Sequence, residues 1–245
     1  MPIVQILMTN NSTPAPATAV MSLIANDYFG SGSSWGDSSG FNNSGTLVNA
    51  PVFTNTSPKH FTFDRTSTQY VQGPNVGSFS TWTLESWFKL SEPLSNMEAT
   101  TLITTTYQDG FGNLYGVINY TLSNWVESDT DGYNDHVTVG FYNGTWYTTA
   151  GFVPTVGTWY HVVGTYDGTT LKQWVNGTLG TTRSVSANTS SNGGPVRIAR
   201  RWDGNASDPQ YFFPGDIAVA KIYDGVLTDE EIVAAFNATR STYSV

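Results

Sequence analysis

The segment from Thr158 to Leu179 constrains the fold of this chain more than any other stretch. It reads TWYHVVGTYDGTTLKQWVNGTL, in which Asp167-Gly168 and Asn176-Gly177 separate three extended runs. Both dipeptides are typical of type I′ turns, because Asn, Asp and Gly adopt positive φ at little cost. Large apolar side chains alternate onto both faces of the first run, with Trp159 on one face and Val162 on the other. We therefore predict a three-stranded antiparallel meander inside a two-layered β structure, with a second sheet covering one face and loops partly covering the other.

A second central strand is predicted at residues 81–90, which read TWTLESWFKL. The side chains alternate between two faces, as expected for a strand. One face carries the apolar residues Trp82, Leu84, Phe88 and Leu90. The opposite face carries Thr83, Glu85, Trp87 and Lys89. Since both faces hold large side chains, this strand belongs in the middle of a sheet.

One short helix is predicted near the C-terminus. Residues 228–231 read TDEE, a capping box in which the Thr228 hydroxyl and the Glu231 carboxylate each accept a hydrogen bond from an otherwise unpaired amide. Val233 and Phe236 extend its apolar stripe. We expect this helix to pack on the β structure rather than to form a domain. The stretch 26–52 before the central strands is rich in turn residues, and we expect Trp35 and Phe41 to anchor it to the core.

The composition excludes several classes of function. Only 12% of the 245 residues are charged, so the surface must consist largely of Ser, Thr, Asn and Gly, which we interpret as a protein that works outside a cell or on a particle. The net charge of −9 argues against nucleic-acid binding, which depends on clustered Lys and Arg. The basic residues are scattered, apart from Arg197, Arg200 and Arg201. No cysteine is present, which excludes disulfides, thiolate metal sites and cysteine nucleophiles and fits folding in a reducing cytosol.

Residues 1–19 are predicted to form an extended N-terminal arm and linker ahead of one domain over residues 20–245. The apolar run within MPIVQILM has no basic residue before it and is too short for a signal peptide or a membrane span. The following NNSTPAPAT is a Pro/Ser/Thr linker. Two interpretations of the arm are open: it docks as an added strand on the sheet edge of a neighbour, or it pairs with its own domain.

Four segments carry a resemblance to a known family, namely residues 34–53, 82–90, 157–177 and 196–237. In series they resemble the laminin-G-like jelly roll of the concanavalin A and pentraxin group. The resemblance implies an all-β fold, a two-sheet antiparallel jelly-roll sandwich with a short helix near the C-terminus. Proteins of this group include lectins, adhesion modules, glycan-binding appendages of enzymes and viral structural proteins, so the fold alone does not define the function. Many members bind calcium, and some are glycosidases.

We predict no catalytic residue and no enzymatic activity. Glycoside hydrolysis needs two carboxylates held across the scissile bond, and related catalytic jelly rolls place them in a Glu-x-Asp-x-Glu strand. The nearest stretch here, Glu127 to Asp131, ends in Asp and is flanked by turn residues. The histidines His60, His136 and His161 are far apart in the sequence and lie in or beside strand patterns, which favours structural roles over a catalytic dyad or a zinc site.

Calcium is the one metal for which candidate ligands exist, because it prefers several oxygen ligands on a bent loop. Two loops, at residues 127–135 and 203–208, supply Asp and Asn side chains. The candidate ligands are Asp129, Asp131, Asp203, Asn205 and Asp208. The resemblance implies that Asp203 lies near an acidic calcium ligand of pentraxins, although the adjacent Glu-Gln of that family is replaced here by Arg201-Trp202. The alternative is that these residues are solvated turn residues.

Candidate glycan-binding residues lie in the same two loops. Binding a sugar needs an exposed aromatic plane for its apolar face and polar side chains for its hydroxyls. Trp125, Tyr133 and Trp202 supply the planes, and Arg201 supplies donors. The alternative is that these aromatic residues anchor long loops to the core.

These features predict a non-enzymatic structural or adhesion protein of a virus particle, namely a phage capsid-decoration or fibre component, with glycan binding. The alternatives are a free, calcium-dependent carbohydrate-binding lectin module outside the cell and, ranked last, a glycoside hydrolase. The expected partners are other virion or surface proteins, reached through the N-terminal arm, and cell-surface glycans. We expect a homo-oligomer and neither nucleic-acid binding nor membrane insertion.

Overall fold

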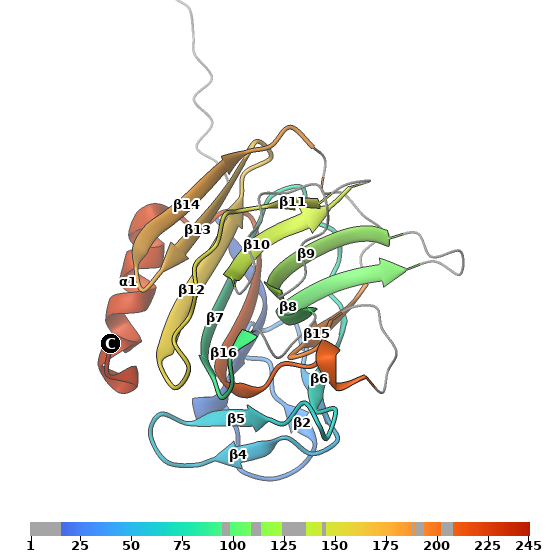
Figure 1. Cartoon of the computed structure of the whole chain (residues 1–245), viewed down its shortest axis with the longest axis vertical. Helices are drawn as coiled ribbons and strands as arrows, with labels where there is room; N and C mark the ends of the chain where they lie inside the picture. The colour runs from blue at the N-terminus through green and yellow to red at the C-terminus, as the bar shows by residue number, and fades with distance from the viewer. Residues whose placement is uncertain are drawn as a thin grey trace, which may run out of the picture.

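The protein is a sandwich of two antiparallel β-sheets with a helix on one outer face, as seen in a computed structural model (Figure 1). The structure describes residues 16–94, 99–108, 114–123, 136–143, 146–187, 189, 194–201 and 208–245. Within these residues each sheet has eight strands, and every strand pair is antiparallel. The predicted jelly-roll sandwich is therefore confirmed. No helix in the described residues has the length and apolar character needed to cross a membrane.

The first sheet, sheet A, contains the predicted central strands. Its strands in order are β14 (Thr178–Ser184), β13 (Thr170–Val175), β12 (Trp159–Tyr166), β7 (Trp82–Leu90), β16 (Gly215–Asp224), β5 (His60–Phe63) and β4 (Val52–Thr54), with β1 (Thr18–Ile24) also paired to β16. The meander β12-β13-β14 is the one predicted from the sequence. β1 begins at Thr18, two residues before the predicted start of the domain.

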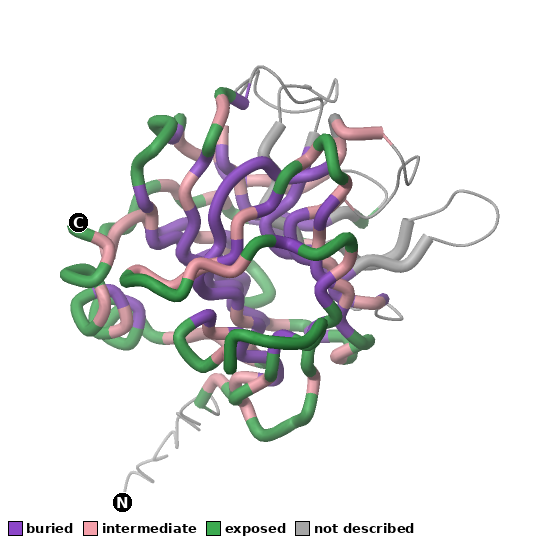
Figure 2. Tube along the Cα trace, turned by 90° about the horizontal axis from the view of Figure 1, so that it is seen from below, coloured by how far each residue is buried: buried purple, intermediate pink, exposed green. Residues whose placement is uncertain are grey.

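The second sheet, sheet B, packs on one face of sheet A. Its strands in order are β11 (Trp146–Thr148), β10 (His136–Tyr142), β9 (Leu114–Ser123), β8 (Ala99–Gln108), β15 (Pro195–Ile198), β6 (Tyr70–Asn75), β3 (Gly45–Val48) and β2 (Ser34–Trp35). The helical segments are η1 (Ala25–Asp27), η3 (Pro209–Tyr211), α1 (Asp229–Thr239) and η4 (Arg240–Tyr243). The main core lies between the two sheets, and Figure 2 shows the buried residues running through the middle of the molecule.

The alternation of β7 places its two faces in different surroundings, as predicted. Trp82, Leu84 and Phe88 lie in the main core between the sheets. Trp87 lies on the opposite face, in a smaller cluster with Trp159 and Phe236. That face is covered mainly by α1 and η4, and Leu227 of the loop before α1 packs beside them, so loops cover less of it than expected. Burial on both faces explains why the strand carries large side chains at nearly every position.

Of the two turns of the meander, one is as predicted and one is different. Asn176 and Gly177 have φ of 50° and 72°, which confirms a type I′ turn. At the other turn only Gly168 has positive φ, and residues 167–169 separate the strands. The Asp167 carboxylate explains the difference, since it accepts hydrogen bonds at 2.8 Å from the amides of Thr169 and Thr170. This side-chain turn takes the place of the tighter backbone turn.

The capping box of α1 is confirmed. The Glu231 amide donates to the Thr228 hydroxyl at 3.2 Å, and the Thr228 amide donates to the Glu231 carboxylate at 2.8 Å. Ile232 and Phe236, one helical turn apart, are buried against sheet A. The prediction for Val233 was wrong, because its position beside Ile232 turns it away from the sheet and leaves 36% of it exposed.

The stretch before the central strands is anchored differently from the prediction. Trp35 is fully buried in the main core, but Phe41 is 55% exposed and is no anchor. The Asp37 carboxylate holds this loop instead, because it accepts hydrogen bonds from the amides of Ser22 on β1 and Asn43, both at 2.8 Å. The loop thereby covers the outer edge of β1.

Candidate functional site

The described part of the predicted glycan and calcium loop lies at the end of β15. Ile198 is buried in the main core, and the next residue, Ala199, has φ of 65°, which turns the chain. Arg200 then pairs with Phe212 in an isolated antiparallel bridge. The Arg201 amide donates to the Tyr211 carbonyl at 2.9 Å. These contacts hold the segments 199–201 and 211–213 side by side.

The Arg200 side chain lies on two aromatic rings. Its guanidinium carbon is 4.8 Å from the ring centroid of Tyr70 and 5.3 Å from that of Phe212. Tyr70 precedes Val71, which is fully buried in the core, so the Tyr70 ring lies on the outer face of sheet B. The Thr101 hydroxyl donates to the Arg200 carbonyl at 2.5 Å and fixes the backbone below. Such cation–π contacts stabilise the position of the guanidinium.

Arg201 and Asp208 are the two predicted site residues that the structure describes, and both lie beside this cluster. The guanidinium of Arg201 is 5.3 Å from the ring centroid of Tyr211. The Asp208 carbonyl accepts a hydrogen bond at 3.2 Å from the Tyr211 amide, at the start of η3. Both side chains are half-buried. We call Tyr70, Arg200, Arg201, Tyr211 and Phe212 the arginine–aromatic site.

A row of polar side chains crosses the same outer face of sheet B next to this site. The register pairs Thr46 with Gln72, Gln72 with Arg197, and Arg197 with Thr104. Neighbouring positions across strands lie on one face of a sheet, so the row brings the Thr46 hydroxyl, the Gln72 amide and the Arg197 guanidinium together, while Thr104 at its end is fully buried. Such groups are suited to the hydroxyls of a sugar.

The other predicted site residues lie outside the described residues. They are Trp125, Tyr133 and Trp202 among the glycan-binding candidates, and Asp129, Asp131, Asp203 and Asn205 among the calcium candidates. The stretch from Glu127 to Asp131, which we considered for catalysis, also lies outside them. These predictions therefore stay predictions from the sequence.

The part of the chain that the structure describes contains no group of three or more His, Asp or Glu side chains placed to hold a metal ion. Asp208 is the single calcium candidate within that part. The described residues alone therefore do not form the oxygen-rich cage that calcium prefers.

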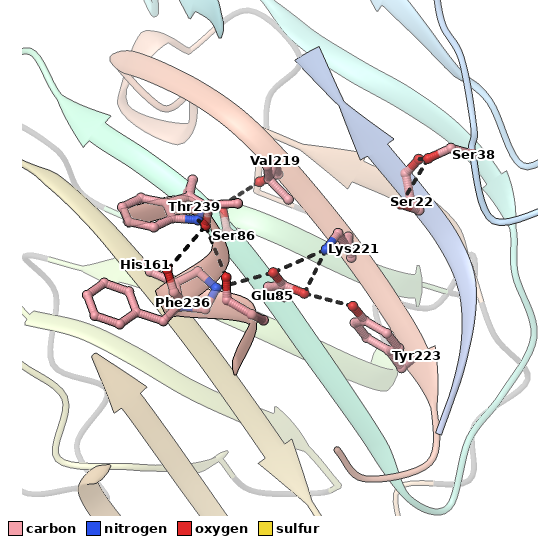
Figure 3. A network of polar contacts seen from close by, with 12 residues as sticks. Ser22, Ser38, Glu85, Ser86, His161, Val219, Lys221, Tyr223, Phe236 and Thr239 are labelled. Carbon is pink, nitrogen blue, oxygen red and sulfur yellow. Dashed lines mark hydrogen bonds and ion pairs between the residues drawn. The ribbon is translucent and has the colours of Figure 1, made fainter. Parts of the chain in front are cut away.

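A second polar cluster lies on the opposite side of the sandwich, on the outer face of sheet A (Figure 3). Glu85 is at its centre, in the middle of β7, with only 4% of its side chain exposed. Its carboxylate accepts hydrogen bonds from Tyr223 at 2.7 Å and from Lys221 at 3.1 Å, and His161 Nε2 lies at 3.2 Å. Lys221 is directly opposite Glu85 on β16, while His161 belongs to β12 on the other side. The two strands that flank β7 thus supply all three partners.

The surroundings of Glu85 strongly favour its ionised form. Burial would raise its pKa, but the hydrogen bond from His161 and the charge of Lys221 outweigh it and lower the pKa to about 2. The same cluster acts in the opposite direction on Tyr223, whose pKa is raised by burial and by the Glu85 charge. Glu85 is therefore a carboxylate throughout the physiological pH range, and Tyr223 is a neutral hydrogen-bond donor.

The C-terminal segment covers the His161 side of this network, while Lys221 at the other side keeps 20% of its side chain exposed. The rings of Phe236 and Tyr243 stack on Trp87, with centroids 6.0 and 3.9 Å away. The Trp87 indole donates to the Thr239 hydroxyl at 3.1 Å, and His161 stacks on Phe236. A carboxylate that faces a packed helix cannot reach a glycosidic bond in a groove. The network is therefore structural, in agreement with the role predicted for His161.

Sequence analysis missed both the Glu85 network and the position of Arg200. The alternation of residues 81–90 placed Glu85 on the face opposite the apolar core, which was a signal that it needs a buried partner. For Arg200, the signal was the cluster of three arginines in an acidic chain. Neither signal identifies the partner, because His161 and Tyr70 reach these residues only through strand pairing.

Solved structures with the same fold come from several kinds of protein. Domain 4 of AbnA, a GH43 extracellular arabinanase from Geobacillus stearothermophilus in complex with arabinotriose, is 16% identical with a TM-score of 0.66, over 90% of this chain and 98% of that one. The binding domain of botulinum neurotoxin DC in complex with SialylT is 14% identical with a TM-score of 0.65, over 90% and 51%. The Trypanosoma rangeli sialidase in complex with the inhibitor DANA is 15% identical with a TM-score of 0.59, over 88% and 32%. At these identities the likeness shows the fold alone.

The sequence itself identifies the family. No curated protein is similar enough in sequence to count as a relative. A family model, by contrast, matches residues 65–233, which span more than half of the chain and include the central strands β7 and β12, both arginines of the arginine–aromatic site and the capping box of α1. The chain belongs to the concanavalin A-like lectin/glucanases superfamily.

Proposed function

We propose that this protein is a non-enzymatic adhesion protein that binds carbohydrate at the arginine–aromatic site on the outer face of sheet B. The observation that carries this proposal is the placement of Arg200 and Arg201 on the rings of Tyr70, Phe212 and Tyr211. Phe212 is fully buried, so the half-buried rings of Tyr70 and Tyr211 supply the aromatic contact, and the arginines supply the polar donors, that sugar recognition needs. Neighbours of the same fold support it, since domain 4 of the arabinanase was solved with arabinotriose and the ligand binding domain of botulinum neurotoxin serotype D with N-acetylneuraminic acid.

The absence of enzymatic activity is part of the same proposal. Glu85 is the most deeply buried carboxylate of sheet A, and three partners and the C-terminal segment occupy its surroundings. Asp216, the other buried carboxylate of this sheet, is held by Lys89 at 2.8 Å and by the Thr62 hydroxyl at 2.7 Å. Both carboxylates thus stabilise the strands that carry them.

We place this adhesion function on a virus particle, with the N-terminal arm contacting other virion proteins; residues 1–15 of the predicted arm lie outside the described residues, and Thr18 and Ala19 belong to β1. The sequence supports this location through its few charged residues, its lack of cysteine and its apolar run followed by a Pro/Ser/Thr linker. A free lectin outside the cell is the alternative. The glycan-binding surface is the same in both cases.

The proposal is tested by screening the purified protein on an array of immobilised glycans. We expect the wild type to bind and leave the glycan intact, and Tyr211→Ala to weaken binding about two- to tenfold, as expected for the loss of an aromatic contact. Arg183 is a matched control position, because its guanidinium also lies on a tyrosine ring, that of Tyr147 on the far strand of sheet B. Arg201→Ala should weaken binding and Arg183→Ala should not. If no glycan binds, or if Arg183→Ala has the same effect, this function is wrong.

Calcium is a separate part of the proposal, with Asp208 and the loop before it as ligands. A metal that binds only the native state must raise its stability, by about 2.7 kcal/mol at a hundred times the dissociation constant. We therefore expect a higher melting temperature in millimolar calcium than in chelator. Asp208→Ala should remove the difference, and Asp27→Ala, in η1, should keep it. Identical melting curves for the wild type would remove calcium from the proposal.

A further inference from the structure

The guanidinium of Arg200 is positioned by its surroundings but not neutralised by them. Its Nε atom is buried and has no hydrogen-bond partner. The two Nη atoms make no bond within the described residues and are not among the buried unpartnered atoms, so the half-buried Arg200 side chain keeps this end partly accessible. A buried donor without a partner is unusual in a native protein and calls for an explanation.

Four other cations of the described residues have carboxylate partners, whereas Arg183 and Arg240, like Arg200, lie on aromatic rings. Lys89 pairs with Asp216 at 2.8 Å, Arg65 with Glu92 at 2.8 Å, and Lys221 with Glu85 at 3.1 Å. The chain has 19 acidic and ten basic residues, so acidic side chains are abundant. Within the described part of the chain, none of them pairs with Arg200. An unpaired arginine in so acidic a chain leaves a place for an anion from outside.

The geometry of the arginine limits what that anion can be. The rings of Tyr70 and Phe212 lie against the guanidinium. Because Nε is buried, a ligand cannot bind to the side of the guanidinium that is formed by Nε and one Nη. The two Nη atoms leave the end of the planar fork free. That end donates two parallel hydrogen bonds to a carboxylate, the bidentate arrangement for which arginine is preferred over lysine. The Arg201 guanidinium, on the ring of Tyr211, lies beside this end of the site.

We propose that the arginine–aromatic site recognises a carboxylated glycan, whose carboxylate binds end-on to the Arg200 guanidinium. This inference rests on the proposed glycan binding and adds the chemical class of the sugar. Sialic acids and uronic acids both carry such a carboxylate. A neutral sugar leaves Arg200 without its anion and binds less tightly.

The experiment compares two ligands that differ only in charge. Calorimetric titration with 3′-sialyllactose and with its methyl ester measures the preference for the free carboxylate, and trigalacturonate and its methyl ester make the same comparison for a uronic acid. We expect the free acid of at least one pair to bind about ten- to a hundredfold more tightly, as expected for charge-assisted hydrogen bonds. A preference in the sialyllactose pair identifies a sialic acid as the ligand, and a preference in the trigalacturonate pair identifies a uronic acid.

Two variants connect this preference to Arg200. In Arg200→Gln, the affinity for the free acid should fall to that for the methyl ester, and the affinity for the ester should not change. Arg200→Lys should keep only part of the preference for the free acid. Arg240→Gln is the matched control, because it removes the same charge from a guanidinium on another ring, that of Phe236, beside the outer face of sheet A. It should leave the preference intact. Melting temperatures of all variants check that the fold is retained.

The outcomes separate this inference from the proposed function. Equal affinity for acid and ester in both pairs, or an equal loss of preference in Arg240→Gln, overturns the role of Arg200 but leaves glycan binding standing. If neither the acids nor the esters bind, and the glycan array is also empty, the proposed function fails together with this inference.

Discussion

Replacing Glu85 by alanine is expected to destabilise the protein by about 3 to 5 kcal/mol, the range measured when one member of a buried ion pair is removed. The variant leaves the buried His161 and the half-buried Lys221 and Tyr223 without their shared acceptor. Urea unfolding at pH 7 measures the free energy of unfolding. Glu92→Ala is the control, because Glu92 pairs with Arg65 at the surface, where such a pair contributes about 0 to 1 kcal/mol.

The pH dependence of the free energy of unfolding gives an independent measure of how much the Glu85 network stabilises the fold. The pKa of Glu85 is about 2 in the folded protein, against 4.5 for an unperturbed glutamate of the unfolded chain, so the folded state binds this proton less readily than the unfolded state. The contribution to stability is therefore complete above pH 4.5 and is lost as the pH falls toward 2. The shift corresponds to roughly 3 kcal/mol. Glu85→Gln should lose less stability than the wild type over this range, and parallel acid unfolding curves would contradict this account.

Replacing Trp87 by alanine is expected to cost about 3 to 5 kcal/mol, the range for removing a buried aromatic side chain. The variant removes the ring against which Phe236 and Tyr243 stack, together with the donor to Thr239. We therefore also expect α1 and η4 to be cleaved by protease well before the sheets. Urea unfolding and limited proteolysis measure the two effects.

Two further substitutions control for this result. Trp87→Phe keeps a ring but loses the indole donor, and it should have a smaller effect on both measurements. Phe29→Ala removes an aromatic residue that is 98% exposed, and it should change stability by no more than about 0.5 kcal/mol. If Trp87→Ala lowers stability but leaves the C-terminal segment as resistant as in the wild type, Trp87 does not hold that segment in place.

The parts of the fold that could be predicted from sequence are those set by neighbouring residues. The alternation of residues 82–90, the turn at Asn176-Gly177 and the capping box at Thr228 depend on local spacing, and all three are confirmed. The turn at Asp167 was mispredicted because its carboxylate competes with the backbone for the same amides. Phe41 was mispredicted because a turn-rich loop can be held by hydrogen bonds instead of by a ring.

The candidate sites depend on contacts that local spacing does not encode. Arg201 and Asp208 were identified by residue type in a turn-rich loop, and the structure places both beside Tyr211. The position of Arg200 on Tyr70 follows from the pairing of β15 with β6, and that of His161 at Glu85 from the pairing of β12 with β7. These pairings join distant parts of the sequence, so the sequence showed unusual residues without showing their partners.

The pairing of β1 with β16 also affects how the protein is made. Thr18 lies opposite Asp224, so the first described strand finds its place only when the last strand has been synthesised. Contacts between such distant residues slow folding. Glu85 and His161 leave the ribosome well before Lys221 and Tyr223, so a partly made chain carries a carboxylate that lacks two of its partners. Sheet A is therefore complete only after β16 has been synthesised, and a chain that stops short of β16 leaves Glu85 incompletely neutralised.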